Sequence, residues 1–345
     1  MCTIILLMRG ISPCLAQISD SAENYIIKLR NEHQAILKEF LQYSGAVVHS
    51  RSKEEAAALQ THLITMVDNS LRRVSEVSCH NKDCSLRDSL VSYLTLVFRS
   101  LKEDRFQKLY FNNLNQLSYN EVETILSGSG IIDKEIHQKA KNLEAAQYLF
   151  AKKFNVVLSS EKDTLSGKIE LINSLNDYYK RIFLIFLKSY KLGYQLFNEI
   201  DSMGFDAAEY FRIKQIEATT AGLLKLDSIK SFEDDSSLII VCSKILLFYQ
   251  YEAKFQVPLI IDYLKRRVFF EKKNQNLPAE SKNSLNDAGL DEYNRETEAL
   301  NKIHEKVVVI QHELLQQRNG LIYDWNLLSR DFMKKHILSF NLQNF

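Results

Sequence analysis

The stretch that decides the fold is Lys168 to Asp201, KIELINSLNDYYKRIFLIFLKSYKLGYQLFNEID. Its apolar residues recur at alternating steps of four and three, which predicts one long helix with two apolar seams offset by one position. Adjacent residues lie roughly 100° apart around a helix, so the two seams together form an arc wider than a surface helix needs. We therefore predict that this helix is central in a bundle, with a polar edge at Asn173, Asp177, Arg181, Lys188 and Gln195.

The composition predicts an all-α protein. Three prolines and ten glycines in 345 residues leave few breaks, and the length is enough to bury a large core. We expect an elongated multi-helix bundle of about nine or ten helices around the central helix. The sequence predicts the following parts: a signal peptide at 1–16, an N-terminal helical module at 17–130, a central helical hairpin at 131–205, a second helical module at 206–273, a polar loop at 274–288 and a C-terminal helical hairpin at 289–345.

Glycines mark two predicted helix ends within this division. The run Ser127-Gly128-Ser129-Gly130 is interpreted as a hairpin turn after a short helix that a capping box at Ser118 and Glu121 begins. Gly320 is interpreted as the end of the helix that precedes Trp325.

The first residues resemble part of an export signal. An apolar run from Ile4 to Met8 is followed by Pro13 and by compact residues up to Ala16. We expect cleavage after Ala16; the alternative is a disordered or partly buried N-terminus. A lipid anchor at Cys14 is less favoured because Pro13 stands where a small flexible residue is wanted. No other stretch approaches the roughly 18 uninterrupted apolar residues of a membrane span.

Two of the five cysteines, Cys79 and Cys84, bracket a short polar loop. In an oxidising compartment they could close a local disulfide and leave Cys242 buried and free; in a reducing one they would be ordinary thiols. Together with His80 they provide at most three metal ligands, whereas a closed structural zinc site requires four. We therefore expect no metal site.

Common chemical motifs of helical proteins are incomplete in this chain. None of the eight histidines follows a glutamate by three residues, as a di-iron bundle requires. His312-Glu313 resembles the start of a zinc-protease helix, but Gln316 stands where the second histidine belongs. Gly128 and Gly130 lack the Lys-Ser or Lys-Thr pair of a phosphate-binding loop. We predict no catalytic residues and no cofactor.

Charge and aromatic clusters offer two further candidates. With 44 basic and 43 acidic residues the net charge is +1, so no global field attracts nucleic acid. The densest basic cluster could contact lipid head groups or a nucleic acid, although a solvated helix end is the simpler interpretation at this net charge. The aromatic seam of the central helix could line a ligand cavity, but such a stripe is usually core. The candidate basic contact patch is Lys265, Arg266, Arg267, Lys272 and Lys273.

Two segments of the chain are similar to each other in sequence. Asp83-Cys84-Ser85-Leu86 and Asp235-Ser236-Ser237-Leu238 each begin an apolar helix, and apolar residues precede both at equal offsets. A duplicated helix-turn-helix unit would make the protein two related bundles. The alternative is a chance match, because Asp and Ser are favoured at helix starts in general.

Several segments together resemble those of a known group of proteins: Asn176 to Lys191, Ala146-Gln147, Phe150 to Lys153, Asp83 to Arg87, and the C-terminal residues Trp325, Phe332 and His336-Ile337. They are similar to a family of uncharacterised helical surface proteins or lipoproteins of Bacteroidetes and spirochaetes. The resemblance implies export and an all-helical fold, and it supplies no activity or functional residues.

Taken together, the sequence predicts an exported, non-enzymatic helical protein of the periplasm or cell surface that binds or scaffolds an unknown protein partner. Nucleic acid is not an expected partner, and peripheral membrane association is open. One alternative is a lipid-handling or hydrolytic enzyme with a cavity beside the central helix. Another is a cytosolic helical adaptor.

Overall fold

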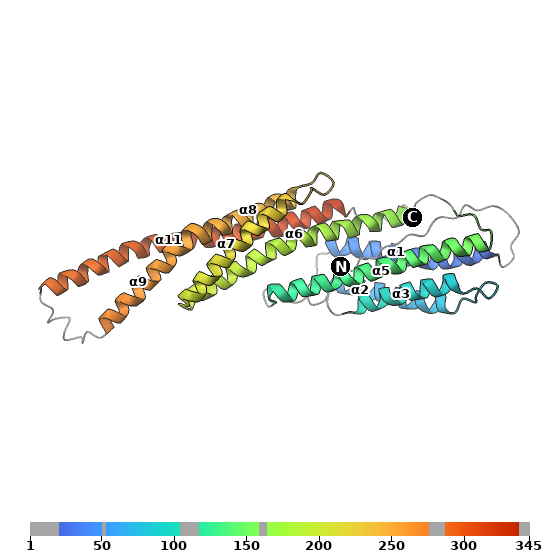
Figure 1. Ribbon diagram of the computed structural model, residues 1–345, viewed down its shortest axis with the longest axis horizontal. Helices are drawn as coiled ribbons and strands as arrows, with labels where there is room; N and C mark the ends of the chain where they lie inside the picture. Colours follow the sequence, from blue (N-terminus) through green and yellow to red (C-terminus); the bar gives the residue numbers. More distant parts are fainter. Residues whose placement is uncertain (1–20, 50–52, 104–116, 159–163, 276–286, 338–345) are drawn as a thin grey trace. The chain divides into compact units, whose positions relative to one another are not determined.

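A computed structural model describes residues 21–49, 53–103, 117–158, 164–275 and 287–337 (Figure 1). Within these ranges the chain is all α, with nine α-helices and one π-helical segment, as the composition predicted. The predicted signal peptide and most of the predicted polar loop lie outside the described residues. The elements are α1 (Ala22–His49), α2 (Lys53–Ser75), α3 (Ser85–Lys102), α5 (Tyr119–Lys153), α6 (Thr164–Asp201), α7 (Phe205–Asp227), α8 (Ser237–Tyr251), η1 (Glu252–Gln256), α9 (Val257–Gln275) and α11 (Asp287–His336).

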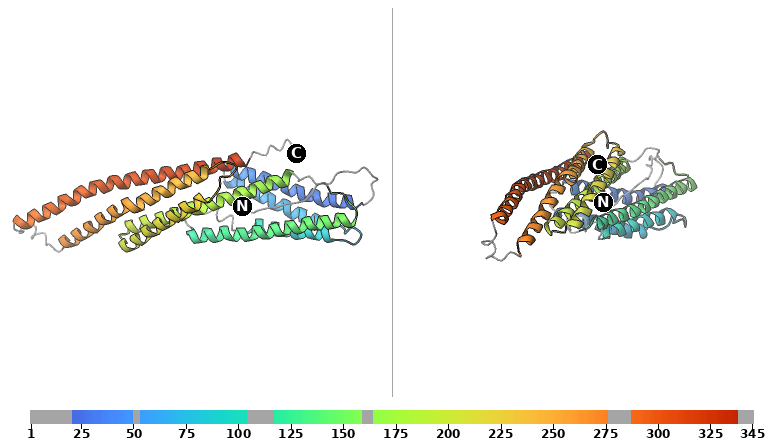
Figure 2. Two further views of the ribbon diagram at one scale, coloured as in Figure 1. Left: turned by 45° about the horizontal axis from the view of Figure 1, so that its top comes forward. Right: turned by 60° about the vertical axis from the view of Figure 1, so that its left-hand side comes forward.

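The chain divides into two compact units, one up to Lys180 together with the end from Arg330, and the other from Arg181 to Ser329. In the first unit α1 packs on α2, α2 on α3 and α3 on α5 (Figures 1 and 2). Partly buried polar contacts accompany this packing. The Ser70 hydroxyl donates to Glu32 across α1 and α2 at 2.6 Å, and Lys139 of α5 donates to Ser92 of α3 at 2.8 Å.

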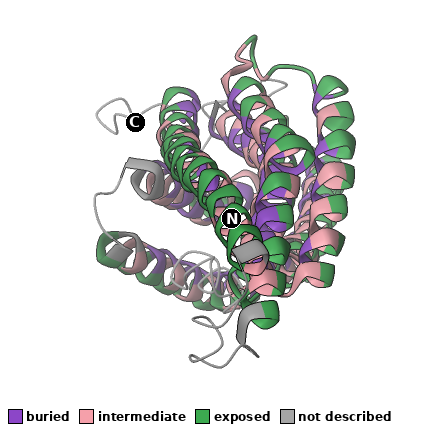
Figure 3. Cartoon of the chain, turned by 90° about the vertical axis from the view of Figure 1, so that its left-hand side faces the viewer, coloured by how far each residue is buried: buried purple, intermediate pink, exposed green. Residues whose placement is uncertain are grey.

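In the second unit α7 packs against α8, η1 and α9. The end of α6 and the middle of α11 complete the core. Most helices carry buried residues along one side and exposed residues along the other, as amphipathic helices do (Figure 3). The buried core cluster of this unit is Leu196, Ile200, Ala208, Val257, Ile260, Ile261, Tyr263, Leu264, Val307 and Leu314.

Helix α6 contains the predicted double seam. Leu175, Ile182 and Leu196 of one seam are fully buried. In the other seam, Phe186 is 5% exposed and Ile200 is 1% exposed. The predicted polar edge is exposed at four of its five positions. Asn173 is the exception: its side chain is only 6% exposed, so its assignment to the polar edge was wrong.

Two predicted helix ends were also wrong. Helix α5 continues through Gly130, and α11 runs unbroken for 50 residues through Gly320. Neither glycine has a positive φ. A glycine inside a helix costs only about 1 kcal/mol relative to alanine, which the packing of its neighbours outweighs. The predicted boundary between 130 and 131 therefore lies within α5, and the predicted C-terminal hairpin is a single helix over its described residues.

The hairpins α2–α3 and α7–α8 have the same turn at positions 152 residues apart. Asn81 and Lys82 have φ values of 45° and 64°, and their counterparts Glu233 and Asp234 have 46° and 62°. In both turns the fourth residue donates its backbone N–H to the carbonyl of the first at 2.8 Å. The second turn is Phe232 to Asp235.

The aspartate that ends each turn also accepts a hydrogen bond from the first residue of the next helix. Asp83 Oδ1 accepts a hydrogen bond from the Ser85 backbone N–H at 3.0 Å, and Asp235 Oδ1 accepts one from Ser237 at 2.9 Å. The buried positions of the two hairpins also correspond. The paired buried residues include Leu63 and Gln215, Val67 and Thr219, Ser70 and Gly222, Val74 and Leu226, Leu86 and Leu238, Leu90 and Cys242, and Leu94 and Leu246.

Two glycine-to-alanine substitutions should change stability in opposite directions. An added Cβ at Gly320 meets no atom within 4 Å, so Gly320→Ala should raise the free energy of unfolding by about 0.5–1 kcal/mol. At Gly222 the added carbon would lie 2.9 Å from Leu246 and 3.0 Å from Ile185, so Gly222→Ala should lower it by about 1–3 kcal/mol. Urea denaturation measures both values, and a destabilised Gly320→Ala variant would contradict the unbroken α11.

Candidate functional site

The cysteine pair lies at the tip of the first hairpin. Cys79 and Cys84 are joined by a disulfide across the turn, with their Cα atoms 4.6 Å apart. A loop this short gains about 2 kcal/mol from closure in the chain-entropy model. Cys242 is buried and free in α8, and burial raises the pKa of its thiol to about 12.

The tip is also held by α5. Lys153 Nζ donates to Asp83 Oδ2 at 2.6 Å, and this bond, with those from Ser85, lowers the pKa of Asp83 to about 2. The ring of His80 meets that of Phe154 edge-on at a centroid distance of 4.8 Å. Among the described residues no cluster of three or more His, Cys, Asp or Glu side chains could hold a metal ion. The tip is a turn packed against the end of α5.

The predicted basic patch lies on α9, and most of its charges are already in ion pairs. The ion pairs join Arg266 to Asp262 at 2.8 Å, Arg267 to Glu271 at 3.4 Å, and Lys273 to Glu296 at 3.0 Å and Glu292 at 3.3 Å. Lys265 Nζ lies 5.8 Å from the ring centroid of Phe205. The ion pairs reduce the positive field that the patch offers to an anionic surface.

The aromatic seam of α6 is filled by other rings. Phe186 stacks on Trp325 of α11 with a centroid distance of 4.2 Å, and Tyr190 lies 5.8 Å from Phe186. Phe186 is 5% exposed and Trp325 2%. At this place, where the enzymatic alternative puts a ligand cavity, the side chains pack as core.

A buried ion pair lies at the π-helical segment, and sequence reasoning missed it. Arg318 of α11 donates to Glu252, whose side chain is 1% exposed. Burial raises the pKa of Glu252, and the Arg318 charge partly offsets the rise. The Arg318 guanidinium also lies 3.9 Å from the ring centroid of Phe197. A single acidic residue in the apolar run from Leu238 to Ala253 was the available signal.

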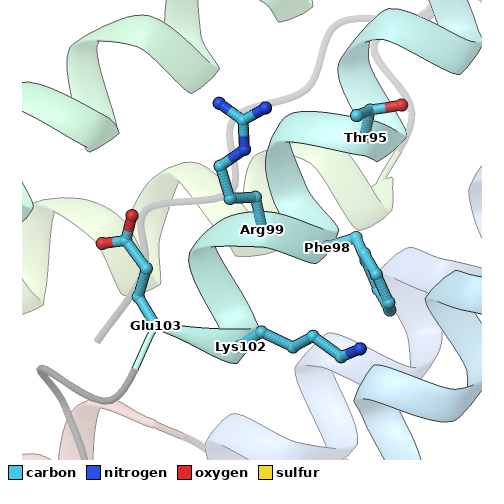
Figure 4. A pocket seen from close by; sticks show the side chains of 5 residues that line it. All are labelled: Thr95, Phe98, Arg99, Lys102 and Glu103. Atoms are coloured by element: carbon cyan, nitrogen blue, oxygen red, sulfur yellow. The ribbon is translucent and has the colours of Figure 1, made fainter.

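Two shallow surface hollows are lined by single stretches of helix or by a helix and the turn after it. Figure 4 shows one of them, with its side chains projecting from α3 and its end rather than converging from several elements. Lys102 Nζ lies 4.4 Å from the centroid of the Phe98 ring in this hollow. The lining residues are Thr95, Phe98, Arg99, Lys102 and Glu103 in the first and Lys141, Glu144, Ala145, Gln147, Tyr148 and Leu158 in the second.

The second unit carries a row of exposed apolar side chains along α8, η1 and α9, which we call the outer stripe. Each of its five side chains is 48–59% exposed. Spacings of seven, four, four and four residues keep them on one side, and the rings of Tyr251 and Phe255 are 5.5 Å apart. The outer stripe consists of Ile240, Leu247, Tyr251, Phe255 and Leu259.

Helix α7 adds further exposed apolar residues. Tyr210, Ile213 and Leu224 are 57%, 44% and 68% exposed. On the exposed side of the α7–α8 pair, Gln250 Nε2 of α8 donates a hydrogen bond to the Thr220 hydroxyl of α7 at 2.9 Å. The run from Leu238 to Tyr249 is almost entirely apolar in sequence, and an apolar residue on the outer side of a helix cannot be distinguished from core without knowing its neighbours.

Comparison with protein-family models, with curated proteins and with solved structures gave no match. The resemblance to bacterial surface proteins stays an expectation. None of the described helices is both long and apolar enough to cross a bilayer.

Removing the Arg318 charge should destabilise the protein strongly at neutral pH. Arg318→Leu leaves Glu252 buried without a counter-charge, so the free energy of unfolding at pH 7 should fall by about 3–5 kcal/mol. The pKa of Glu252 would then rise further above its unfolded value. The folded state would bind the extra proton, so stability should increase as pH falls from 7 towards 5.

The control is the double variant Glu252→Gln with Arg318→Leu, which removes both charges. It should recover much of the lost stability at pH 7 and lose the added pH dependence. Urea denaturation at pH 5 and pH 7 measures both effects, and an Arg318→Leu variant as stable as the parent at pH 7 would show that the pair is solvated.

Proposed function

We propose that this chain is an exported, non-enzymatic protein that binds or scaffolds another protein through its helical surface. The observation that carries the proposal is the outer stripe. Five large apolar side chains are exposed on the same side of the helices, and the rings of Tyr251 and Phe255 lie 5.5 Å apart; exposed apolar groups gathered on one side are typical of an interaction site. The stripe lies on a helical rod whose other side is buried core, so it is presented without further ordering.

Two observations support export. The apolar run and Ala16 resemble an export signal, and a disulfide between Cys79 and Cys84 is stable in an oxidising compartment. A periplasmic or surface location is compatible with both. A cytosolic adaptor would keep the two cysteines as thiols.

A photo-cross-linking residue at position 251 should capture a partner protein in living cells of the native host. Tyr251 is exposed at the centre of the outer stripe. The matched control is the same residue at position 99, which is the exposed counterpart of 251 in the first hairpin. A discrete cross-linked band from 251 that is absent from 99 is the expected result, and equal labelling from the two positions would contradict a specific surface.

The mass of the intact protein purified from that host should show its location. Export predicts loss of residues 1–16 and two fewer hydrogens than the reduced chain, because the Cys79–Cys84 disulfide is formed. A chain with residues 1–16 and free thiols would favour the cytosolic adaptor instead.

A further inference from the structure

The two hairpins provide an internal comparison for the outer stripe. Their inward positions are similar, since Leu86 and Leu94 correspond to Leu238 and Leu246 and all four are buried. Their outward positions differ in chemistry. The outer-stripe residues Ile240, Leu247 and Tyr251 correspond to the exposed residues Asp88, Thr95 and Arg99 of the first hairpin, and Phe255 corresponds to the half-buried Glu103 just after α3.

Three of these first-hairpin side chains line the hollow on α3 in Figure 4. The same position in the same supersecondary unit is therefore polar in one copy and apolar in the other. Helix α7 shows the same difference at two positions. Its exposed residues Ile213 and Leu224 correspond to Thr61 and Arg72 of α2, whereas Tyr210 corresponds to Ala58.

This difference cannot come from the needs of the hairpin itself, because the first copy has the same turn with a polar outer side. Exposed apolar groups gain free energy only when something covers them. The apolar character of the outer stripe is therefore a feature of the surface of the second hairpin and not a requirement of its fold. It points to a molecule that covers this surface.

The charges beside the outer stripe indicate the chemistry of the occupant. Between Ser237 and Ile261 the charged residues are Lys244, Glu252 and Lys254. Glu252 is buried with Arg318, whereas both lysines are exposed and pair with no carboxylate of the described residues. The nearby acidic residues Glu217 and Asp262 already pair with Lys214 and Arg266. Unpaired charge along the stripe is therefore positive.

Resting on the proposed function, we propose that the outer stripe binds an amphipathic α-helix of a partner protein whose apolar side is flanked by carboxylates. The stripe from Ile240 to Leu259 spans about 28 Å at the rise of an α-helix, which matches a partner helix of about five turns. Lys244 and Lys254 are ten residues apart, so the matching carboxylates lie about 15 Å apart on the partner.

Two other occupants fit less well. A second copy of the chain would bring the lysines of two stripes together, and the segment from Ser237 to Ile261 has no unengaged carboxylate to meet them. An anionic membrane would gain only about 1 kcal/mol from each of two lysines, beside the acidic Glu217 of α7.

The test uses the full chain and two synthetic 21-residue helical peptides with the same leucine stripe. One peptide has glutamates on both flanks of the stripe and the other has lysines. Fluorescence anisotropy at about 150 mM salt should show binding of the acidic peptide at least tenfold tighter than binding of the basic one. The charge-reversed variant Lys244→Glu with Lys254→Glu should invert this preference.

The matched apolar control transfers the residues of the first hairpin to the second. The quadruple variant I240D, L247T, Y251R and F255E changes only exposed positions, so its circular dichroism and melting temperature should stay close to those of the parent. It should bind neither peptide. A parallel variant, Thr95→Leu, alters the first hairpin and should leave the binding of both peptides unchanged.

Two binding results would overturn the proposal: equal affinity for the two peptides, or binding of the acidic peptide that the quadruple variant retains. Two other occupants would also overturn it. These are phosphatidylglycerol vesicles that bind the outer stripe when the peptides do not, or a dimer in analytical ultracentrifugation that the quadruple variant abolishes. Failure of the peptides with a persistent cross-link from position 251 would reject the acidic helix and keep the binding function. Failure of both would reject the binding function as well.

Discussion

Burial of the apolar sides of the helices is the constraint on which the rest of this structure depends. It is most demanding on α6, whose two seams leave only a narrow polar edge, and whose residues contribute to both compact units. A helix of this kind cannot be stable on a surface, because too much apolar area would face water. Its burial requires helices on several sides: Tyr249 of α8 lies against Gly193, and Trp325 of α11 stacks on Phe186.

The two hairpins share the same turn structure. In each, two residues with positive φ reverse the chain, and an aspartate closes the turn and caps the following helix. The first hairpin has Cys79 and Cys84 around the turn, and the second has Ser231 and Ser236 at the corresponding positions. Because both turns have the same geometry, the disulfide adds to a turn that the other residues already specify.

The two copies differ where packing does not constrain them. The paired inward residues of α3 and α8 are apolar in both hairpins, whereas the outer-stripe positions of α8 correspond to polar residues on α3. The second unit also contains the Glu252–Arg318 pair at the π-helical segment, where an acidic side chain is buried beside α11. A buried charge needs a partner from another element, so this pair also aligns α11 with η1.

The sequence by itself determined the helical class, the double seam of α6, the capping box at Ser118 and the duplicated helix starts, because these depend on periodicity and on hydrogen bonds between residues close in the chain. It did not determine that α5 and α11 continue through their glycines, since the packing that outweighs the cost of glycine comes from distant residues. It also could not separate the outer stripe from core or pair Glu252 with Arg318, which lie 66 residues apart. Only the tertiary structure decides which side of a helix is covered, because a long-range neighbour and not the local pattern excludes the water.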